Sequence, residues 1–376
     1  MLKKIAVLLG FIMLLSHNST AAAMPSVSAQ SAIIINAATG TVLGEYNART
    51  RLPMASTTKI MTALILAEQP NLDKTVVTTR EMVMVEGSSM GLKVGDTVSY
   101  RALLYGMMLA SGNDAANTTA IAIAGSIEEF AKMMNAKARE IGMKDTNFVT
   151  PSGLDHKDHY TTAYDLAILT AYAMKNPEFR AAAQSVSAEV YFGNPPYKRY
   201  LRNHNRLLTT YDGCIGVKTG FTKKSGRCLV SAASRDNKEV IAVTLNAPDD
   251  WNDHMAMLDF GLSCLENYEL EVPLSDDTIP VISGEADRVR LEIEKVRLGL
   301  TGNEHKNITA KVHLPEFIYA PISRGDIVGY IEYLLDGKTI TRANIKAAAD
   351  MQIKPPEPKS FLERLVEQLR LLSLYI

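Results

Sequence analysis

The pattern of apolar and polar positions between residues 32 and 262 alternates between strand-like and helical segments. Residues 32–47, AIIINAATGTVLGEYN, predict two short strands around an Ala-Thr-Gly turn, and residues 214–247 predict two strands joined by turns and then a third strand. Residues 56–69 are apolar on nearly every face after the first turn, which predicts a helix in the middle of a domain. Strands at both ends with helices between them predict an α+β domain whose sheet is closed by distant segments.

Four more helices are predicted between these strands. Residues 99–126 give two apolar helices broken at Ser111-Gly112-Asn113, and residues 127–143 and 162–176 give two amphipathic helices. Past about Leu265 the pattern changes to strand-like alternation with an Asp336-Gly337 hairpin turn. This change predicts a smaller, mostly β domain over residues 266–353.

The amino-terminal segment has the layout of a secretory signal. Residues 1–23 contain two lysines, an apolar run and a closing Ala-Ala-Ala. Cleavage after Ala23 is expected, with Ala29 as a second site, and the main domain then occupies residues 24–265. An uncleaved anchor is disfavoured because the apolar run is shorter than the ~20 residues that span a bilayer. We therefore expect an exported protein.

The carboxyl-terminal residues 354–376 are predicted to form a stiff, proline-rich linker and an amphipathic helix. Phe361–Ile376 place apolar side chains on one side and charged side chains on the other, with too little continuous apolar length to cross a bilayer. We expect this helix to attach the protein to the outer face of the cytoplasmic membrane. Docking of the helix on the protein itself or on another subunit is the alternative.

Composition narrows the function classes only slightly. The 376 residues are 47% hydrophobic and 22% charged with a net charge of −1, so no basic excess indicates nucleic acid as a partner. Cys214, Cys228 and Cys264 cannot all pair internally and show no C-x-x-C metal spacing. We expect packing thiols, although a Cys214–Cys228 bridge across one hairpin stays open.

Ser56 and Lys59 lie three residues apart at the start of the predicted buried helix. Residues i and i+3 share a helix face, so the lysine amine can reach the serine hydroxyl. The helix N-terminus adds free N–H groups suited to a developing oxyanion. A helix cap and a solvated lysine would be the ordinary interpretation, but a charge inside an apolar helix is costly. The pair therefore predicts an acyl-transfer nucleophile and its base, provided that the amine is neutral.

The Lys-Thr/Ser-Gly signature occurs twice in VKTGFTKKSGRC. Lys218-Thr219-Gly220 lies in an apolar, β-favouring run, which predicts an edge strand on which Gly220 permits close backbone approach. Lys224-Ser225-Gly226 has turn composition. We expect the first copy to be functional and the second to be the hairpin turn. Lys218 would lower the pKa of Lys59 as a second cation, together with burial, and would bind an anionic group of the substrate.

Ser111 and Asn113 lie at the predicted helix break, where a hydroxyl and an amide two residues apart can face one cleft. Taken alone, this pattern is most often a helix cap. The pattern indicates a functional site only together with the other two motifs, because S-x-x-K, S-x-N and K-T-G follow one another along the chain.

With their surroundings, PMASTTKIMTAL, SSMGLKVGDTVSYRALLYGMMLASGNDAAN and GCIGVKTGFT, the three motifs closely resemble the low-molecular-mass penicillin-binding proteins. Within that group the chain looks like a serine-type D-alanyl-D-alanine carboxypeptidase. The resemblance is strong over about residues 30–265 and looser beyond. It implies an α+β, transpeptidase-like domain with a helical subdomain, then a small β-rich domain and a terminal amphipathic helix.

The resemblance also implies roles for the motif residues. Ser56 would be the acylated nucleophile, Lys59 the base, Ser111 and Asn113 the relay and positioning residues, and Lys218 with Thr219 the grip on a terminal carboxylate. The oxyanion hole would use the backbone N–H groups of Ser56 and Phe221; Phe221 departs from relatives that carry histidine there. Arg202, His204 and Arg206 form a basic cluster without an assigned role.

The implied substrate is a peptidoglycan stem peptide, β-lactams would acylate Ser56, and no metal or organic cofactor is required. Three rival functions remain open. A serine β-lactamase would need a fast deacylation base, for which no acidic segment is found. A zinc peptidase would need ligands beyond Asp155, His156, Asp158 and His159, which are expected to be solvated loop residues. The sequence does not distinguish a carboxypeptidase from a penicillin-binding sensor that is acylated but does not turn over.

Overall fold

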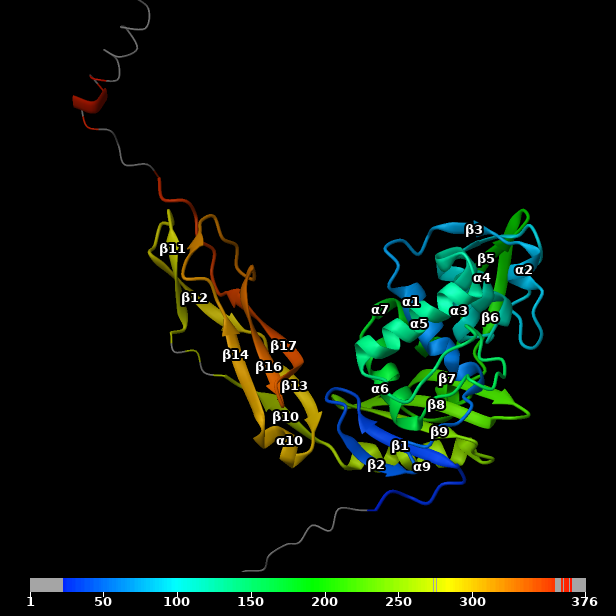
Figure 1. The fold of residues 1–376 in the computed structure, drawn as a ribbon. Coiled ribbons are helices and arrows are strands. Elements are labelled where there is room, and N and C mark those ends of the chain that lie inside the picture. The colour runs from blue at the N-terminus through cyan, green and yellow to red at the C-terminus, as the bar shows by residue number, and fades with distance from the viewer. Residues whose placement is uncertain are drawn as a thin grey trace, which may run out of the picture.

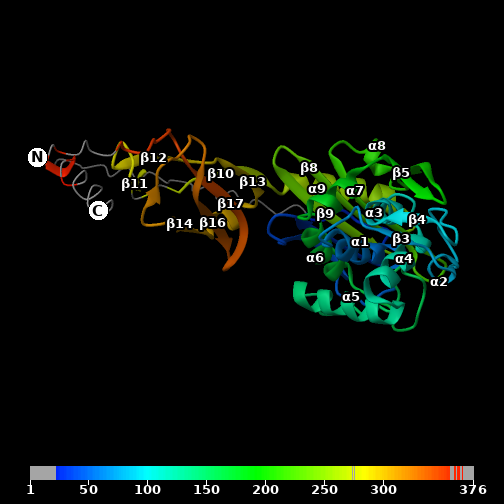
Figure 2. The same ribbon diagram turned by 90° about the horizontal axis from the view of Figure 1, so that it is seen from above.

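The computed structural model describes residues 23–272, 274, 276–355, 360, 362–364 and 366. They form a larger domain of mixed helices and strands and a smaller, elongated β domain beside it (Figures 1 and 2). The predicted signal segment lies outside the described residues except for Ala23, and so does most of the predicted terminal helix. The described Leu362 and Val366 are exposed.

The larger domain is built on a five-stranded antiparallel sheet in which the two ends of the domain meet. Its strands, in spatial order, are β2 (Val42–Tyr46), β1 (Ser31–Asn36), β9 (Lys238–Leu245), β8 (Gly226–Arg235) and β7 (Cys214–Thr222). The predictions of a closed sheet and of Lys218-Thr219-Gly220 on an edge strand are confirmed. Lys224 and Ser225 lie in the β7–β8 turn, as predicted.

Helices cover both faces of this sheet (Figure 1). The alternation of β1 explains why, because Ile33 and Ile35 belong to the larger apolar core and Ile34 to a second core on the other face. The second core contains α9 (Asp250–Ser263). The larger core contains α1 (Lys59–Ala67), α3 (Tyr100–Met108), α4 (Asn113–Ala124), α5 (Ile127–Ile141), α6 (Ala163–Ala173) and α7 (Pro177–Gln184).

The predicted buried helix begins as a 3₁₀ turn, η1 (Ala55–Thr58), and continues as α1, whose nine residues are all buried. The predicted helix break at Ser111-Gly112-Asn113 is confirmed by the gap between α3 and α4. A second, four-stranded sheet was not predicted. It contains β3 (Thr75–Val77), β4 (Thr97–Ser99), β5 (Ser187–Gly193) and β6 (Pro196–Arg202). The short helix α2 (Arg80–Val83) contacts α4, and the short helix α8 (Leu207–Thr210) contacts β7.

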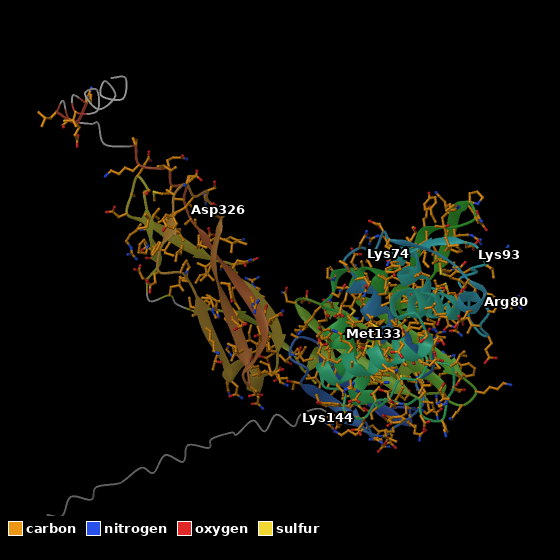
Figure 3. The ribbon with its side chains drawn as sticks, turned by 45° about the horizontal axis from the view of Figure 1, so that its top comes forward. Lys74, Arg80, Lys93, Met133, Lys144 and Asp326 are labelled. Carbon is orange, nitrogen blue, oxygen red and sulfur yellow. The ribbon has the colours of Figure 1, made fainter. Side chains whose placement is uncertain are left out.

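Three basic residues lie in segments beside the strands β3 and β4 of this second sheet. Figure 3 labels Arg80 of α2 and Lys93 of the loop before β4 at the outer edge of the larger domain, and Lys74, which immediately precedes β3, nearer its middle. All three are exposed. They lie far from Asp326, which is labelled in the smaller domain (Figure 3).

The smaller domain is mostly β, as predicted. A two-stranded sheet pairs β10 (Glu266–Leu270) with β13 (Val296–Leu300). A six-stranded sheet contains, in spatial order, β14 (Ile308–His313), β16 (Ile327–Leu335), β17 (Lys338–Ala347), β12 (Arg288–Ile293), β11 (Thr278–Ile282) and β15 (Ile318–Tyr319). The predicted Asp336-Gly337 turn joins β16 to β17, and both residues have positive φ, 49° and 75°.

A buried carboxylate joins the two domains. Glu304 on the short helix α10 (Gly302–Lys306) accepts hydrogen bonds from the Asn36 side chain at 3.2 Å and from Thr39. Asn36 also donates to the carbonyl oxygen of Gly299. This contact ties the end of β1 to the near end of the smaller domain.

The three cysteines are free, so the Cys214–Cys228 bridge does not form. Cys228 is buried, in agreement with a packing thiol. Among the described residues, no helix combines the length and the apolar character needed to cross a bilayer.

Candidate active site

Ser56 and Lys59 are brought together by the local geometry of η1. A 3₁₀ helix has three residues per turn, so side chains at i and i+3 lie one above the other. The Nζ atom of Lys59 accordingly lies 2.9 Å from the Oγ atom of Ser56. The turn is held by the hydroxyls of Thr57 and Thr58, which donate to the carbonyl oxygens of Met54 and Ala55.

The Lys59 amine is buried, and its hydrogen-bond partners carry no charge. In addition to its contact with Ser56 Oγ, Nζ donates to Asn113 Oδ1 and to the carbonyl oxygen of Ser152, each at 2.7 Å. The pKa of Lys59 is held well below its usual value, first by burial and then by the nearby Lys218, against a smaller opposing effect of Asp114. The predicted effect of a second cation is thus present but is smaller than that of burial.

These contacts fit a neutral amine, which has two N–H donors and one lone pair. Asn113 Oδ1 and the Ser152 carbonyl oxygen are acceptors only, so they take the two N–H donors. When the amine is neutral, its lone pair is left for the Ser56 hydroxyl, whose Oγ lies 2.9 Å from Nζ. The arrangement can therefore remove a proton from Ser56 Oγ.

The Ser111-Gly112-Asn113 turn enters the site from the side of α3 and α4. Ser111 has a φ of +56°, an uncommon conformation for a residue other than glycine. The Asn113 amide donates through Nδ2 to the carbonyl oxygen of Glu86 at 2.6 Å, which fixes Oδ1 toward Lys59. No sequence pattern pointed to this contribution of Glu86.

The edge strand β7 lies against the turn that carries Ser56 and forms another side of the site. An added Cβ on Gly220 would lie 3.0 Å from the Ser56 nitrogen and 3.1 Å from that of Thr57, so a side chain there would push β7 and the Ser56 turn apart by a few tenths of an ångström. Lys218 is buried, and its Nζ donates to the carbonyl oxygen of Thr219 at 2.9 Å. Burial lowers the pKa of Lys218 to about 7. Lys218 is therefore only partly charged at neutral pH.

A pocket of about 300 Å³ opens between these elements. Five of the eight predicted site residues line it, namely Ser56, Ser111, Thr219, Gly220 and Phe221. The other three, Lys59, Asn113 and Lys218, are buried. The sequence motifs therefore meet at one cleft.

The pocket is also lined by residues for which no role was predicted. His204, from the unassigned basic cluster, lines it together with Arg227 and Trp251. Arg206 lies over the ring of Trp251 at 4.9 Å. Arg202 is exposed on β6 and does not appear among the lining residues. Arg227 and Trp251 carry no spacing signal, because strand pairing and α9 bring them to the cleft.

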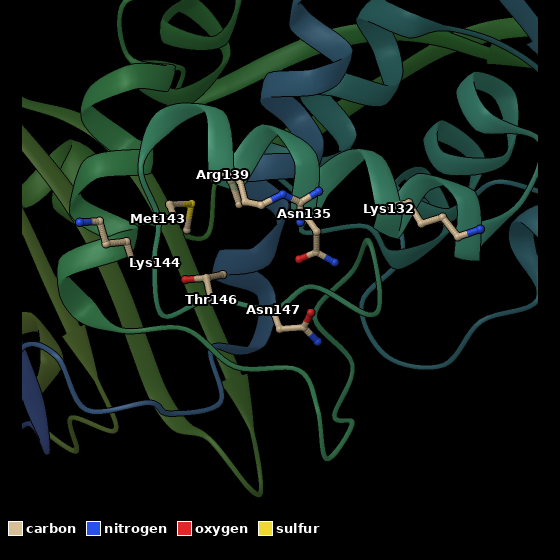
Figure 4. A pocket seen from close by; sticks show the side chains of 8 residues that line it. Lys132, Asn135, Arg139, Met143, Lys144, Thr146 and Asn147 are labelled. Atoms are coloured by element: carbon tan, nitrogen blue, oxygen red, sulfur yellow. The ribbon is translucent and has the colours of Figure 1, made fainter.

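A second cavity, of about 420 Å³, lies between α5 and the segment that follows it (Figure 4). It contains none of the predicted site residues. In Figure 4 the cationic ends of Lys132 and Lys144 point away from one another, and the Asn135 amide is already bonded to the Phe148 backbone. This cavity therefore presents no converging set of polar groups.

Within the part of the chain that the structure describes, no group of three or more His, Cys, Asp and Glu side chains that could hold a metal ion occurs. His156 and Asp158 are exposed, as expected. The expectation of a solvated residue is wrong for His159, which is buried and bonded to Thr58.

Comparison with known proteins agrees with this geometry. Residues 18–249 match the family described as D-alanyl-D-alanine carboxypeptidase. The D-alanyl-D-alanine carboxypeptidase DacF of Bacillus subtilis is 34% identical over 338 residues, which cover 86% of each chain. The chain belongs to the D-alanyl-D-alanine carboxypeptidase family. Residues 268–352 match the carboxyl-terminal domain described for penicillin-binding protein 5.

Solved structures of similar proteins extend the family match to the fold. Penicillin-binding protein 5 from Haemophilus influenzae aligns with a TM-score of 0.61 and 26% identity, covering 87% of this family member and 98% of that chain. The Streptomyces K15 DD-transpeptidase aligns with a TM-score of 0.62 and 33% identity over 64% of this chain and 100% of its own. The α+β transpeptidase-like fold followed by a β-rich domain is thereby confirmed.

Proposed function

We propose that this protein is an exported serine-type carboxypeptidase that removes the terminal D-alanine from peptidoglycan stem peptides. One observation carries the proposal: Lys59 Nζ lies 2.9 Å from Ser56 Oγ, with both of its N–H donors directed to neutral oxygens. This places a base of lowered pKa against a hydroxyl at the floor of a peptide-sized pocket.

In the first step Ser56 Oγ attacks the carbonyl carbon between the two terminal D-alanines while its proton passes to Lys59 Nζ. The backbone N–H groups of Ser56 and Phe221 would hold the resulting oxyanion. Their proximity is supported by the approach of Gly220 to the Ser56 nitrogen. Breaking the C–N bond then releases D-alanine, whose amine recovers the proton from Lys59 with Ser111 as relay.

In the second step water hydrolyses the ester on Ser56 and regenerates the hydroxyl. Asn113 keeps Lys59 in place throughout, and Lys218 with Thr219 binds the carboxylate at the end of the substrate. A β-lactam would enter by the same route and acylate Ser56. The chemistry requires no metal or organic cofactor.

The decisive experiment measures D-alanine released from a soluble pentapeptide, together with labelling by a fluorescent penicillin. We expect release and labelling with the wild-type protein and neither with Ser56→Ala. Labelling without release would indicate a penicillin-binding sensor, and rapid turnover of penicillin would indicate a β-lactamase. Activity lost on chelation would indicate a metal peptidase.

We also propose a separate role for each segment of the chain. Residues 1–23 would direct export, 24–265 would form the catalytic domain, 266–353 the β-rich domain, and 354–376 a linker and a helix held on the outer face of the cytoplasmic membrane. The exposure of Leu362 and Val366 supports the last assignment, since both belong to the apolar face predicted for that helix.

A further inference from the structure

The loop of residues 149–153 lies directly against the turn that carries Ser56. Its Pro151 carbonyl oxygen accepts a hydrogen bond from Thr62, and its Ser152 carbonyl oxygen accepts one from Lys59. Gly153 has a φ of +88°, and an added Cβ there would lie 1.9 Å from the carbonyl oxygen of Ala55. The position of this loop therefore fixes one of the two oxygens that orient the Lys59 amine.

His159 joins the loop to the turn from the buried side. Its Nδ1 accepts the backbone N–H of Val149 at 2.9 Å, and its Nε2 lies 2.8 Å from Thr58 Oγ1. Because Nδ1 is an acceptor, Nε2 carries the hydrogen and donates it to Thr58. The Thr58 hydroxyl in turn donates to the carbonyl oxygen of Ala55 at 2.8 Å.

This chain of hydrogen bonds ends at a strained point. Ala55 has a φ of +48°, which is unusual for alanine, and it immediately precedes Ser56. A protonated imidazole would point a second donor at the Val149 N–H, so the chain requires the neutral ring. Burial, with a smaller effect of His156, lowers the pKa of His159 to about 4 and keeps the ring neutral.

We propose that His159 is a positioning residue, which clamps the 149–153 loop to the Ala55–Thr58 turn so that the Ser152 carbonyl and the Ser56 hydroxyl both meet the Lys59 amine. The proposal rests on the catalytic roles of Ser56 and Lys59 given above. His159 does not touch the substrate. It acts through the loop and the turn.

The alternative is that His159 only fills the core beside Phe148, with which it makes an edge contact at 6.0 Å. A space-filling role would be served by leucine and would affect stability alone. A clamping role depends on the ring nitrogens. Glutamine keeps a donor near the position of Nε2, and Thr58→Val removes the next link while leaving the ring unchanged.

A matched control exists elsewhere in the same domain. His254 is also fully buried and contacts two hydroxyls, those of Ser231 and Thr244, but it lies on α9 near the second core. His254→Leu should lower Tm without changing the kinetics. The full mature chain is used for every variant, and Tm is measured alongside acylation by a fluorescent penicillin and D-alanine release.

For His159→Leu and Thr58→Val we expect kcat to fall at least tenfold with KM nearly unchanged, because displacement of about 1 Å can cost 100-fold in rate. A loosened loop would let water reach Lys59 and would raise its pKa, because burial is the largest cause of its lowered value. The acid limb of the pH–rate profile should therefore move to higher pH. The charged groups that act on Lys59 are Lys218 and Asp114. His159→Gln should recover most of the rate.

The outcomes separate the two proposals. If the wild-type protein is neither labelled at Ser56 nor active, the proposed function fails. If the wild type is active but His159→Leu keeps its kcat and pH profile, or changes only Tm as His254→Leu does, the positioning role is overturned. The role is equally overturned if glutamine restores no more activity than leucine. Should His159→Leu fail to fold, Thr58→Val and His159→Gln decide the matter.

Discussion

The Oδ1 atom of Asn113 lies 2.7 Å from the Nζ atom of Lys59, while the Nδ2 atom of the same amide donates to the carbonyl oxygen of Glu86 at 2.6 Å. The second contact decides which end of the amide faces the lysine. Lys59 therefore meets a neutral acceptor where a carboxylate would favour the ammonium form. The neighbouring carboxylate, that of Asp114, is instead bonded to the backbone N–H groups of Met90 and Leu92.

Asn113→Asp should replace the neutral acceptor beside Lys59 by a carboxylate with almost no change in side-chain volume. A carboxylate at hydrogen-bond distance raises the pKa of a lysine, so the amine would stay charged at neutral pH. We expect acylation at pH 7 to slow by about 100-fold or more, and the acid limb to move up by more than about one pH unit. Asn113→Ala is the control, because it removes the contact without adding charge. An Asp variant with the wild-type profile would refute the requirement for a neutral amine.

Lys218→Gln tests the coupling between the two buried lysines. Lys218 lowers the pKa of Lys59, so its removal should raise that pKa and move the acid limb of acylation to higher pH. The shift should be a fraction of a unit, because burial contributes more than Lys218 and because Lys218, with a pKa of about 7, is itself partly neutral. KM should rise by about tenfold, the equivalent of about 1.4 kcal/mol, through the lost carboxylate contact. An unmoved acid limb would show that Lys218 acts on the substrate alone.

Lys218 should also make stability depend on pH. Its folded-state pKa of about 7 lies below the usual 10.5, so between these values the unfolded chain binds more protons and stability rises with pH. Between pH 7 and pH 8.5 this lysine should add roughly 1–2 kcal/mol to the free energy of unfolding. Lys218→Met should be more stable than the wild type at pH 7 and should lose that part of the rise. Urea titrations of both proteins at pH 7 and pH 8.5 measure the free energy of unfolding. An equal rise with pH in the wild type and in Lys218→Met would contradict the lowered pKa of Lys218.

The sequence was sufficient to place the three motifs on the correct elements. The segment 59–67, apolar on nearly every face, the helix break at Ser111 and the β-favouring run around Lys218 each reflect local preferences that the fold keeps. The turn composition around Ser225 also distinguished the second Lys-Ser-Gly copy, whose serine hydroxyl accepts the Thr222 N–H across the hairpin. These features depend on near neighbours in the chain.

What could not be predicted depends on pairing between distant segments. The strands β3 and β4 have only three residues each and pair with one another, and β4 also pairs with β5, about 90 residues away. The carbonyl oxygens of Glu86 and Ser152 contact Asn113 and Lys59 through the backbone, so no side-chain pattern marks them. His159 was expected to be a solvated loop residue because its burial arises from contact with the distant Ser56 turn.

Gly220→Ala tests whether β7 must approach the Ser56 turn closely. An added Cβ would meet the nitrogens of Ser56 and Thr57 at 3.0 and 3.1 Å, so the strand has to move outward by a few tenths of an ångström. We expect at least a tenfold loss in kcat from the displaced Phe221 N–H, with a modest change in Tm. Gly302→Ala is the matched control, since its Cβ would come no closer than 3.8 Å to its neighbours. Equal activity of the two variants would argue against an oxyanion hole at this strand.

Truncation after residue 355 tests the proposed membrane helix. Because the pocket lies wholly between residues 56 and 251, D-alanine release from a soluble pentapeptide should not change. Binding of the mature protein to phospholipid vesicles should be lost, and Leu362→Gln combined with Val366→Gln should weaken it by at least tenfold, because both side chains belong to the apolar face that would enter the interface. Tyr46→Gln, which changes a side chain on β2 about as exposed as Val366, should bind vesicles as the wild type does. Undiminished vesicle binding by the truncated mature protein would move the attachment site to another surface.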